Sequence, residues 1–178
     1  MTYKVLKQQN NSAHCFVCGL QNDASLKTRF YECENPDGEV VLLAIATPEQ
    51  RHQSYPNRMH GGVISALLDE TIGRAVQITH PDIWGVTVDL NVKYKKPTPL
   101  DQPLYIEAKI TEIKTRGAFG TFAGEGKLFT ADGTICATAE AKYFILPPDK
   151  IAEGGLTPDN WFLANEPLPD TIIIQKEV

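Results

Sequence analysis

Gly61 and Gly62 open an apolar stretch of the sequence, and two carboxylates, Asp69 and Glu70, follow within it. The first N–H groups of a helix have no partner inside the helix, so a helix that begins at these glycines offers donors to a negatively charged oxygen. Glycine also lets a ligand approach the backbone closely. A carboxylate in an apolar stretch is costly unless it is paired or takes part in a reaction. The segment therefore combines a candidate oxyanion donor with a candidate base.

The two carboxylates differ when the segment is drawn as a helix with about 100° per residue. Glu70 lies four residues before Arg74, which predicts an ion pair. Asp69 lies beside the small residues Ser65 and Gly73, which leave room for a ligand. We therefore expect Asp69 to carry the chemistry and Ser65 to border the ligand; the alternative is that Asp69 faces solvent. The apolar side chains share another face: Val63, Ile64, Leu67, Leu68, Ile72 and Ala75.

Gly61 and Asp69 are eight residues apart, which is roughly 12 Å along a helix axis. One carbonyl group cannot contact both. Either the two residues serve different sites, or a second copy of the helix supplies Asp69 to the glycine end of the first. The second option predicts a two-fold dimer with composite sites.

The bulk properties exclude several classes of protein. The 178 residues fit one domain, and the net charge of −5 lacks the basic footprint of a nucleic-acid-binding protein. No apolar run approaches the roughly 20 residues of a membrane span, and the N-terminus lacks the apolar region of a signal peptide. We expect a cytoplasmic protein with no nucleic-acid or membrane partner.

The four cysteines do not predict a metal centre. Cys15 and Cys18 form a single CxxC pair, whereas zinc takes about four ligands. The redox use of CxxC requires a βαβ setting, but the stretch that follows resembles a strand. We therefore expect all four, including Cys33 and Cys136, to be structural thiols that behave as small buried hydrophobes.

The hydrophobic periodicity predicts one long helix at 62–77 and strands on both sides of it. Residues 85–94 alternate most clearly, with Val86, Val88, Leu90, Val92 and Tyr94 on one face. An α+β fold follows, in which an antiparallel sheet wraps around the helix. We expect a single domain at 1–146, and a C-terminal extension at 147–178 that packs on the surface or against a neighbour. The remaining strands are predicted at 26–31, 39–46, 104–114, 118–130 and 134–146.

Three features carry a resemblance to a known family: His60-Gly61-Gly62, Asp69 nine residues after His60, and the run from Gly85 to Asn91 before a turn at Pro97. Together they resemble the hotdog-fold acyl-CoA thioesterases of the 4-hydroxybenzoyl-CoA thioesterase superfamily, and most closely the PaaI-like and THEM-like branch. The opening from His14 to Leu20 is similar to the start of some hotdog proteins. The resemblance covers roughly residues 15–146.

The resemblance implies hydrolysis of an acyl-CoA thioester to a free acid and CoA, by a homodimer that can assemble into a homotetramer. The backbone N–H of Gly61 or Gly62 would polarise the thioester carbonyl. Asp69 of the other subunit would act as base or nucleophile, and Thr87 would orient water. Apart from the CoA of the substrate, no cofactor or metal is implied.

One position departs from the family pattern. Related enzymes often carry Asn or Gln six residues before the histidine, where this chain has Ser54. Asn57 would replace that amide only if the loop is reshaped. We expect His60 to hold the loop through its ring nitrogens rather than to act as a base.

The phosphates of CoA require a basic rim, and each candidate for it is alternatively an ordinary surface charge. The candidates are Arg58, Lys93, Lys95, Lys96, and Arg116 beside Gly117.

Two other functions fit the same fold. A 3-hydroxyacyl thioester hydratase or dehydratase would pair His60 with Asp69 or Glu70, which the helical offset makes difficult within one chain. A non-catalytic acyl-CoA binding module would bind the thioester without turnover. Assays of dehydration, and of binding without hydrolysis, discriminate them.

Overall fold

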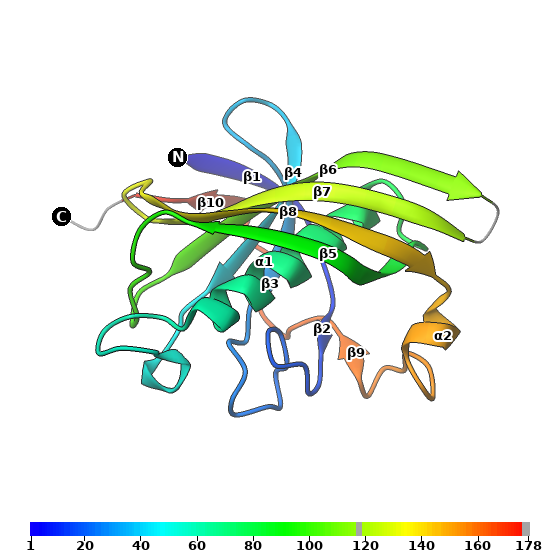
Figure 1. Cartoon of the computed structure of the whole chain (residues 1–178), viewed down its shortest axis with the longest axis horizontal. Helices are drawn as coiled ribbons and strands as arrows, with labels where there is room; N and C mark the ends of the chain where they lie inside the picture. Colours follow the sequence, from blue (N-terminus) through cyan, green and yellow to red (C-terminus); the bar gives the residue numbers. More distant parts are fainter. Residues whose placement is uncertain (117–118, 176–178) are drawn as a thin grey trace.

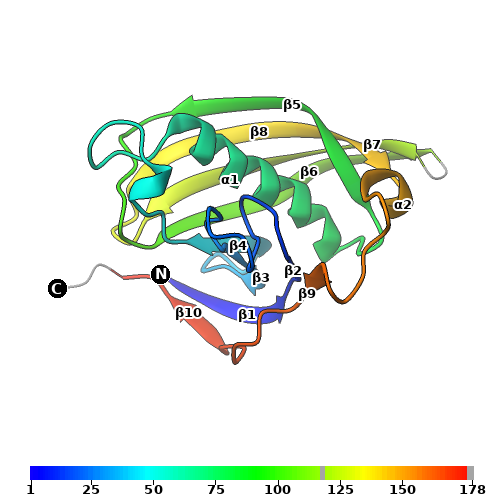
Figure 2. The same cartoon turned by 90° about the horizontal axis from the view of Figure 1, so that it is seen from below.

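The computed structural model describes residues 1–116 and 119–175. One long helix, α1 (Gly61–Ala75), lies across the inner face of an antiparallel sheet with strand order β10-β1-β3-β4-β6-β7-β8-β5, and the sheet curves around it (Figures 1 and 2). The predicted α+β architecture is confirmed. The strands of this sheet are β1 (Thr2–Gln8), β3 (Arg29–Glu34), β4 (Val40–Ala46), β5 (Trp84–Tyr94), β6 (Leu104–Arg116), β7 (Phe119–Thr130), β8 (Ile135–Leu146) and β10 (Thr171–Ile173).

The remaining elements are short. Strands β2 (Asn11–Ser12) and β9 (Trp161–Phe162) pair with each other, and α2 (Pro148–Ile151) follows β8. Two 3-10 turns, η1 (Gln50–His52) and η2 (Val76–Ile78), lie before and after α1. No helix in the described ranges is long and apolar enough to span a membrane.

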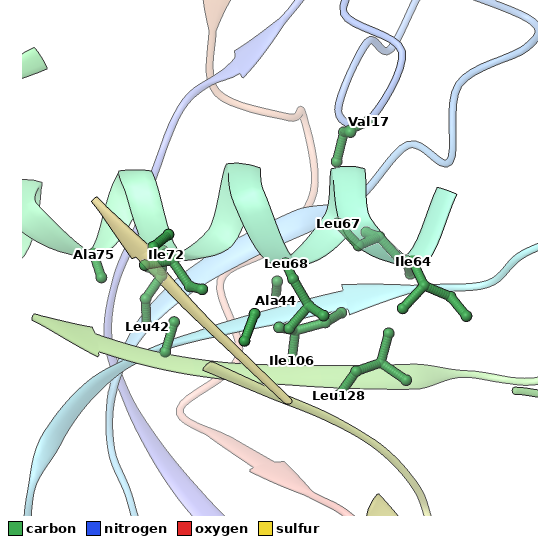
Figure 3. Close-up of a cluster of buried hydrophobic side chains, with 14 of the residues drawn as sticks. Val17, Leu42, Ala44, Ile64, Leu67, Leu68, Ile72, Ala75, Ile106 and Leu128 are labelled. Carbon is green, nitrogen blue, oxygen red and sulfur yellow. The ribbon is translucent and has the colours of Figure 1, made fainter. Parts of the chain in front are cut away.

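The core lies between α1 and the sheet. Leu67, Leu68 and Ile72 are fully buried against strands β4, β6 and β7 (Figure 3), so the predicted apolar face of the helix is confirmed. The glycines of β7 have a packing role. A Cβ at Gly124 or Gly126 would lie within 3.0 Å of the Ile72 side chain, so these positions let the helix approach the sheet.

Strand β5 forms one open edge of the sheet. Its predicted alternation fails in the first half, because β5 carries an extra residue relative to β8 between Thr87 and Asp89. Val88 is 57% exposed at this bulge, and Val86 is also exposed. Thr87 consequently points to the inner face, the side that Leu90 and Tyr94 also occupy.

The two ends of the chain extend the sheet beyond the predicted strands. β1, which the periodicity did not predict, pairs with β3 on one side and with β10 on the other. The first predicted strand begins three residues later than expected, at Arg29. Tyr3 and Ile174 join a second apolar cluster with Leu43 and Phe129, so both ends of the described chain contribute to the packed body.

Candidate functional site

The start of α1 is held by its own N-cap. His60 has extended backbone, and its Nδ1 accepts a hydrogen bond from the Gly62 N–H at 2.9 Å. The Gly61 N–H has no partner within residues 1–116 and 119–175. Of the two expected donors, Gly61 therefore offers the free N–H, and His60 is occupied at the ring nitrogen nearest the helix.

Tyr94, at the end of β5, fixes the position of this helix start. Its hydroxyl donates to the Gly61 carbonyl at 2.8 Å and lies 2.7 Å from the Ser65 hydroxyl. Ser65 thus borders the glycine end of the helix, one turn further along, and is separated from Asp69 by another turn.

The loop before the helix presents Asn57 and Arg58 to solvent. The Ser54 N–H donates to the Arg58 carbonyl at 2.8 Å, and the His60 N–H donates to the His52 carbonyl. Asn57 has φ of 59°, a left-handed conformation that asparagine tolerates better than most residues. This backbone conformation accounts for an asparagine at position 57 without a ligand contact.

Asp69 lies in the middle of α1 and accepts hydrogen bonds from hydroxyl groups on two strands, β5 and β8. Its Oδ1 accepts from the Thr87 hydroxyl at 2.8 Å, and the Tyr143 hydroxyl lies 3.2 Å away. Tyr143 also donates to the Asp69 carbonyl at 2.8 Å. Burial raises the pKa of the Asp69 carboxyl, although the hydrogen bonds from Thr87 and Tyr143 partly offset this rise. The site therefore contains a half-buried carboxyl group suited to proton transfer.

Tyr143 reaches Asp69 because two glycines leave space for its ring. A Cβ at Gly73 would lie 3.0 Å from the Tyr143 ring, and one at Gly85 would lie 2.6 Å from Phe122. Phe122 stacks on Tyr143 with ring centroids 4.7 Å apart. The small residue beside Asp69 that was expected to make room for a ligand is thus in contact with a tyrosine.

A cavity of about 290 Å³ opens beside Asp69, between α1, β5 and the C-terminal segment. Its chemistry is mixed: Asp69, Thr87 and Tyr143 form the polar wall, and Trp84 and Trp161 form an aromatic wall. The other lining residues are Ser12, Cys15, Glu70, Gly73, Arg74, Gln77, Ile83, Gly85 and Ile151.

The predicted ion pair is present: Arg74 Nε lies 2.8 Å from Glu70 Oε1. Arg74 is buried, with its guanidinium between the rings of Phe30 and Trp161, 4.3 and 4.6 Å from their centroids. Glu70 is therefore paired with a buried cation, whereas Asp69 is held by the neutral hydroxyl groups of Thr87 and Tyr143.

The predicted residues fall into two groups within one chain. Asn57, Arg58, Ser65, Lys95 and Lys96 lie at the glycine end of α1, where Lys95 and Lys96 are exposed. Asp69 and Thr87 lie further along the helix. The register of β5, β7 and β8 places the backbone of Arg116 at the other end of the sheet; its side chain and Gly117 lie outside the described residues.

Three residues of the site, Tyr143, Tyr94 and Trp161, were not predicted from the sequence. A signal existed for Tyr143, because it follows Ala137, Ala139 and Ala141 on the inward face of β8 as the first large side chain. The sequence contained no such signal for Tyr94 or Trp161, because an aromatic residue at the end of a strand is commonly part of the hydrophobic core.

The comparisons with known proteins agree with this architecture. A family model described as "Thioesterase superfamily" matches residues 57–137. Acyl-coenzyme A thioesterase 13 of Mus musculus is 31% identical over 92 residues, which are 47% of this chain and 66% of that protein. The matched part spans 40% to 66% of the length of the curated relatives.

Two crystal structures are similar to this chain in fold as well as in sequence. Protein RHA08564, a thioesterase superfamily protein, matches with a TM-score of 0.59 and 28% identity over 73% of this chain and 59% of that chain. The BH2602 protein of Bacillus halodurans, solved with CoA, matches with a TM-score of 0.52 and 28% identity over 64% of this chain and 71% of that one.

Proposed function

We propose that this chain, whose residues 57–137 belong to the thioesterase superfamily, hydrolyses an acyl-CoA thioester to a free acid and CoA. The observation that carries the proposal is the Asp69 carboxyl group, half-buried beside a cavity and bonded to Thr87 and Tyr143. The names of the matched thioesterases, and the CoA in the BH2602 structure, support an acyl-CoA as the substrate.

Asp69 would provide the base. A carboxylate with a raised pKa accepts the proton of a water molecule more readily than an ordinary aspartate, and the resulting hydroxide attacks the thioester carbonyl. The Thr87 hydroxyl, which already contacts Oδ1, would orient that water. Direct attack by Asp69, with a transient anhydride, is the alternative route on the same geometry.

The Gly61 N–H would polarise the carbonyl. It is free at the positive end of the α1 dipole, where it stabilises the oxyanion of a tetrahedral intermediate. Since Gly61 and Asp69 are roughly 12 Å apart on one helix, this donor must come from a second copy of the chain.

The open edge of β5 provides a register for that dimer. Directly opposite residues of an antiparallel pair share a face, and both Thr87 and Tyr94 face inward, where they contact Asp69 and Gly61. If Thr87 of one chain lies opposite Tyr94 of its partner, Asp69 comes next to the partner's helix start. When Val88 is omitted because it lies in the bulge, Asn91 is the middle residue between Thr87 and Tyr94. The two-fold axis of the dimer would therefore pass at Asn91.

The basic rim would be assembled in the same way. Arg58, Lys95 and Lys96 lie at the glycine end of α1, and the dimer brings that end to the partner's Asp69. These side chains are then available to the phosphates of a CoA whose thioester lies at the composite site.

Within one chain, His60 and Glu70 do not form the pair that dehydration requires. A dehydratase requires a histidine paired with an acid, but His60 Nδ1 accepts from Gly62 and Glu70 is bound to Arg74. Neither group is available to the other within the described chain.

The decisive assay measures thiol release and dehydration on a panel of acyl-CoAs that includes 3-hydroxyacyl thioesters. We expect thiol release above the spontaneous rate and no enoyl product. Dehydration would replace the proposal with the hydratase function, and tight binding without either reaction would make the chain a binding module.

A further inference from the structure

Cys15 and Cys18 lie in the loop between β2 and β3, which packs on the side of α1 opposite the sheet; Val17 marks this loop in Figure 3. Both thiols are free. Their sulfur atoms and a Glu70 carboxylate oxygen all lie within 4.8 Å of one another. The proposed mechanism uses neither cysteine.

The backbone holds the two thiols in this arrangement. The Gly19 N–H donates to the Cys15 carbonyl at 2.8 Å, and the Val17 N–H donates to Cys15 Sγ at 3.3 Å. A Cβ at position 19 would lie 2.3 Å from the Cys15 carbonyl oxygen. The tight turn that brings Cys18 back to Cys15 therefore requires glycine.

The two thiols differ in chemistry. Cys15 is half-buried and lines the cavity beside Asp69, whereas Cys18 is fully buried. A hydrogen bond from Cys18 lowers the pKa of the Cys15 thiol. The same hydrogen bond and burial raise the pKa of Cys18, while the Arg74 guanidinium lies 3.3 Å from its sulfur. The accessible thiol is thus the nucleophilic one, and its buried neighbour is held beside a fixed cation.

The sequence predicted structural thiols, because this CxxC does not lie in a βαβ setting, but the loop holds the two sulfur atoms together beside Arg74. We propose that Cys15 and Cys18 form a redox-active dithiol, which a hydroperoxide oxidises to an intramolecular disulfide. The Cys15 thiolate attacks the peroxide, an S–O bond forms and the O–O bond breaks, and the leaving oxygen takes a proton to become water or an alcohol. Cys18 then loses its proton and attacks the Cys15 sulfur, which releases water and leaves the disulfide. Arg74 stabilises the thiolate that Cys18 becomes in the second step.

The same three groups match zinc ligands in type, but Arg74 favours the redox use. Its guanidinium already supplies positive charge to Cys18 at 3.3 Å and to Glu70 at 2.8 Å. A divalent cation between these ligands would lie next to that charge, and the three ligands fall short of the four of a closed zinc site.

Oxidation would also act on the cavity. The disulfide draws the Cys15 side chain away from the wall that it shares with Asp69 and takes a sulfur partner from Arg74. This consequence, unlike the disulfide itself, rests on the proposed thioesterase function. We expect a several-fold change in kcat/KM on oxidation, reversed by a dithiol reductant.

The test treats the reduced protein with stoichiometric hydrogen peroxide, alkylates it under denaturing conditions and records intact and peptide masses. Wild type is expected to lose two alkylatable thiols and to yield a Cys15–Cys18 linked peptide that a reductant cleaves. Cys18→Ser should stop at a sulfenic acid on Cys15, and Cys15→Ser should resist oxidation. Cys136→Ser is the matched control, because Cys136 is a free, buried thiol of β8 outside the pair.

A wild-type protein that keeps both thiols under peroxide, or that forms mainly intermolecular disulfides, overturns the proposal. The proposal is also overturned if the protein is purified with one zinc ion per chain and that zinc protects both thiols from oxidation. An oxidised protein with no thioesterase activity in either state supports the dithiol and counts against the proposed function alone, so the two failures are distinguishable.

Discussion

At the residue scale, Asp69 is defined by two opposing effects on its carboxyl group. Burial disfavours the charged form, and the hydroxyls of Thr87 and Tyr143 favour it. The balance leaves the pKa raised but the oxygen atoms oriented, since both hydroxyls contact Oδ1. A base positioned in this way is expected to respond to small changes in its neighbours as well as to its own removal.

Replacement of Asp69 by asparagine tests the base directly. The amide keeps the size of the side chain but cannot accept a proton, so we expect thiol release to fall by about 10² to 10⁴-fold. Asp37→Asn is the matched control, because Asp37 is exposed in the turn between β3 and β4 and lies away from the β5 edge. Substantial activity in Asp69→Asn, measured with a saturating acyl-CoA, would exclude Asp69 as base or nucleophile.

The pH profile tests the partners of Asp69. Activity should rise with pH as Asp69 loses its proton, with a midpoint above that of an ordinary aspartate because its pKa is raised. Tyr143→Phe and Thr87→Val each remove a hydrogen bond that lowers this pKa, so both should move the acid limb of kcat to higher pH. An unchanged limb in both variants would show that another group controls it.

At the element scale, β5 connects the two halves of the site. Thr87 contacts Asp69 near its start, Tyr94 contacts Gly61 at its end, and the bulge between them turns both inward. In a regular strand the seven steps from Thr87 to Tyr94 would place them on opposite faces; the bulge at Val88 absorbs one step and leaves both on the same face. The bulge is therefore part of the site, because it lets one strand serve both ends of the helix.

A cysteine at position 91 tests the proposed pairing of β5 with its copy. Residues directly opposite in an antiparallel pair have Cα atoms about 4.5 to 5.5 Å apart, which suits a disulfide. We therefore expect Asn91→Cys to form a covalent dimer under mild oxidation, seen on a non-reducing gel. Glu125→Cys, exposed on the same outer face but on β7, should stay monomeric on that gel. Equal cross-linking of both would contradict the register.

The sequence predicted the parts of this arrangement that depend on local pattern. The helical wheel separated Asp69 from the Glu70–Arg74 pair, and the rise per residue separated Asp69 from Gly61. It did not predict the bulge, because Val86 and Val88 continue the apolar alternation of β5 in the sequence although both are exposed in the structure. Nor did it predict β1, where Lys4 and Lys7 lie three residues apart and interrupt the alternation expected of a strand. The contact of Tyr143 with Asp69 was also not predicted, because it depends on the pairing of distant strands.

At the scale of the whole molecule, segments from both ends of the chain close the cavity. Ser12 and Cys15 come from the N-terminal part, and Ile151 and Trp161 come from the part after β8. Arg74 joins these segments, because it donates to the Asn10 carbonyl and packs against Trp161. The helix that carries Asp69 is thus fixed through Arg74 by a segment 64 residues before that arginine and by another 87 residues after it.

Trp161→Ala tests whether this closure matters for stability and for substrate. Trp161 is half-buried, packs against the Arg74 guanidinium and contacts Trp84 with ring centroids 5.1 Å apart. We expect its truncation to lower the free energy of unfolding by about 2 kcal/mol, measured by urea denaturation, and to raise KM for acyl-CoA. Leu163→Ala, at an exposed neighbouring position, should change stability by less than about 0.5 kcal/mol. If the two variants behave alike, the C-terminal segment does not support the cavity.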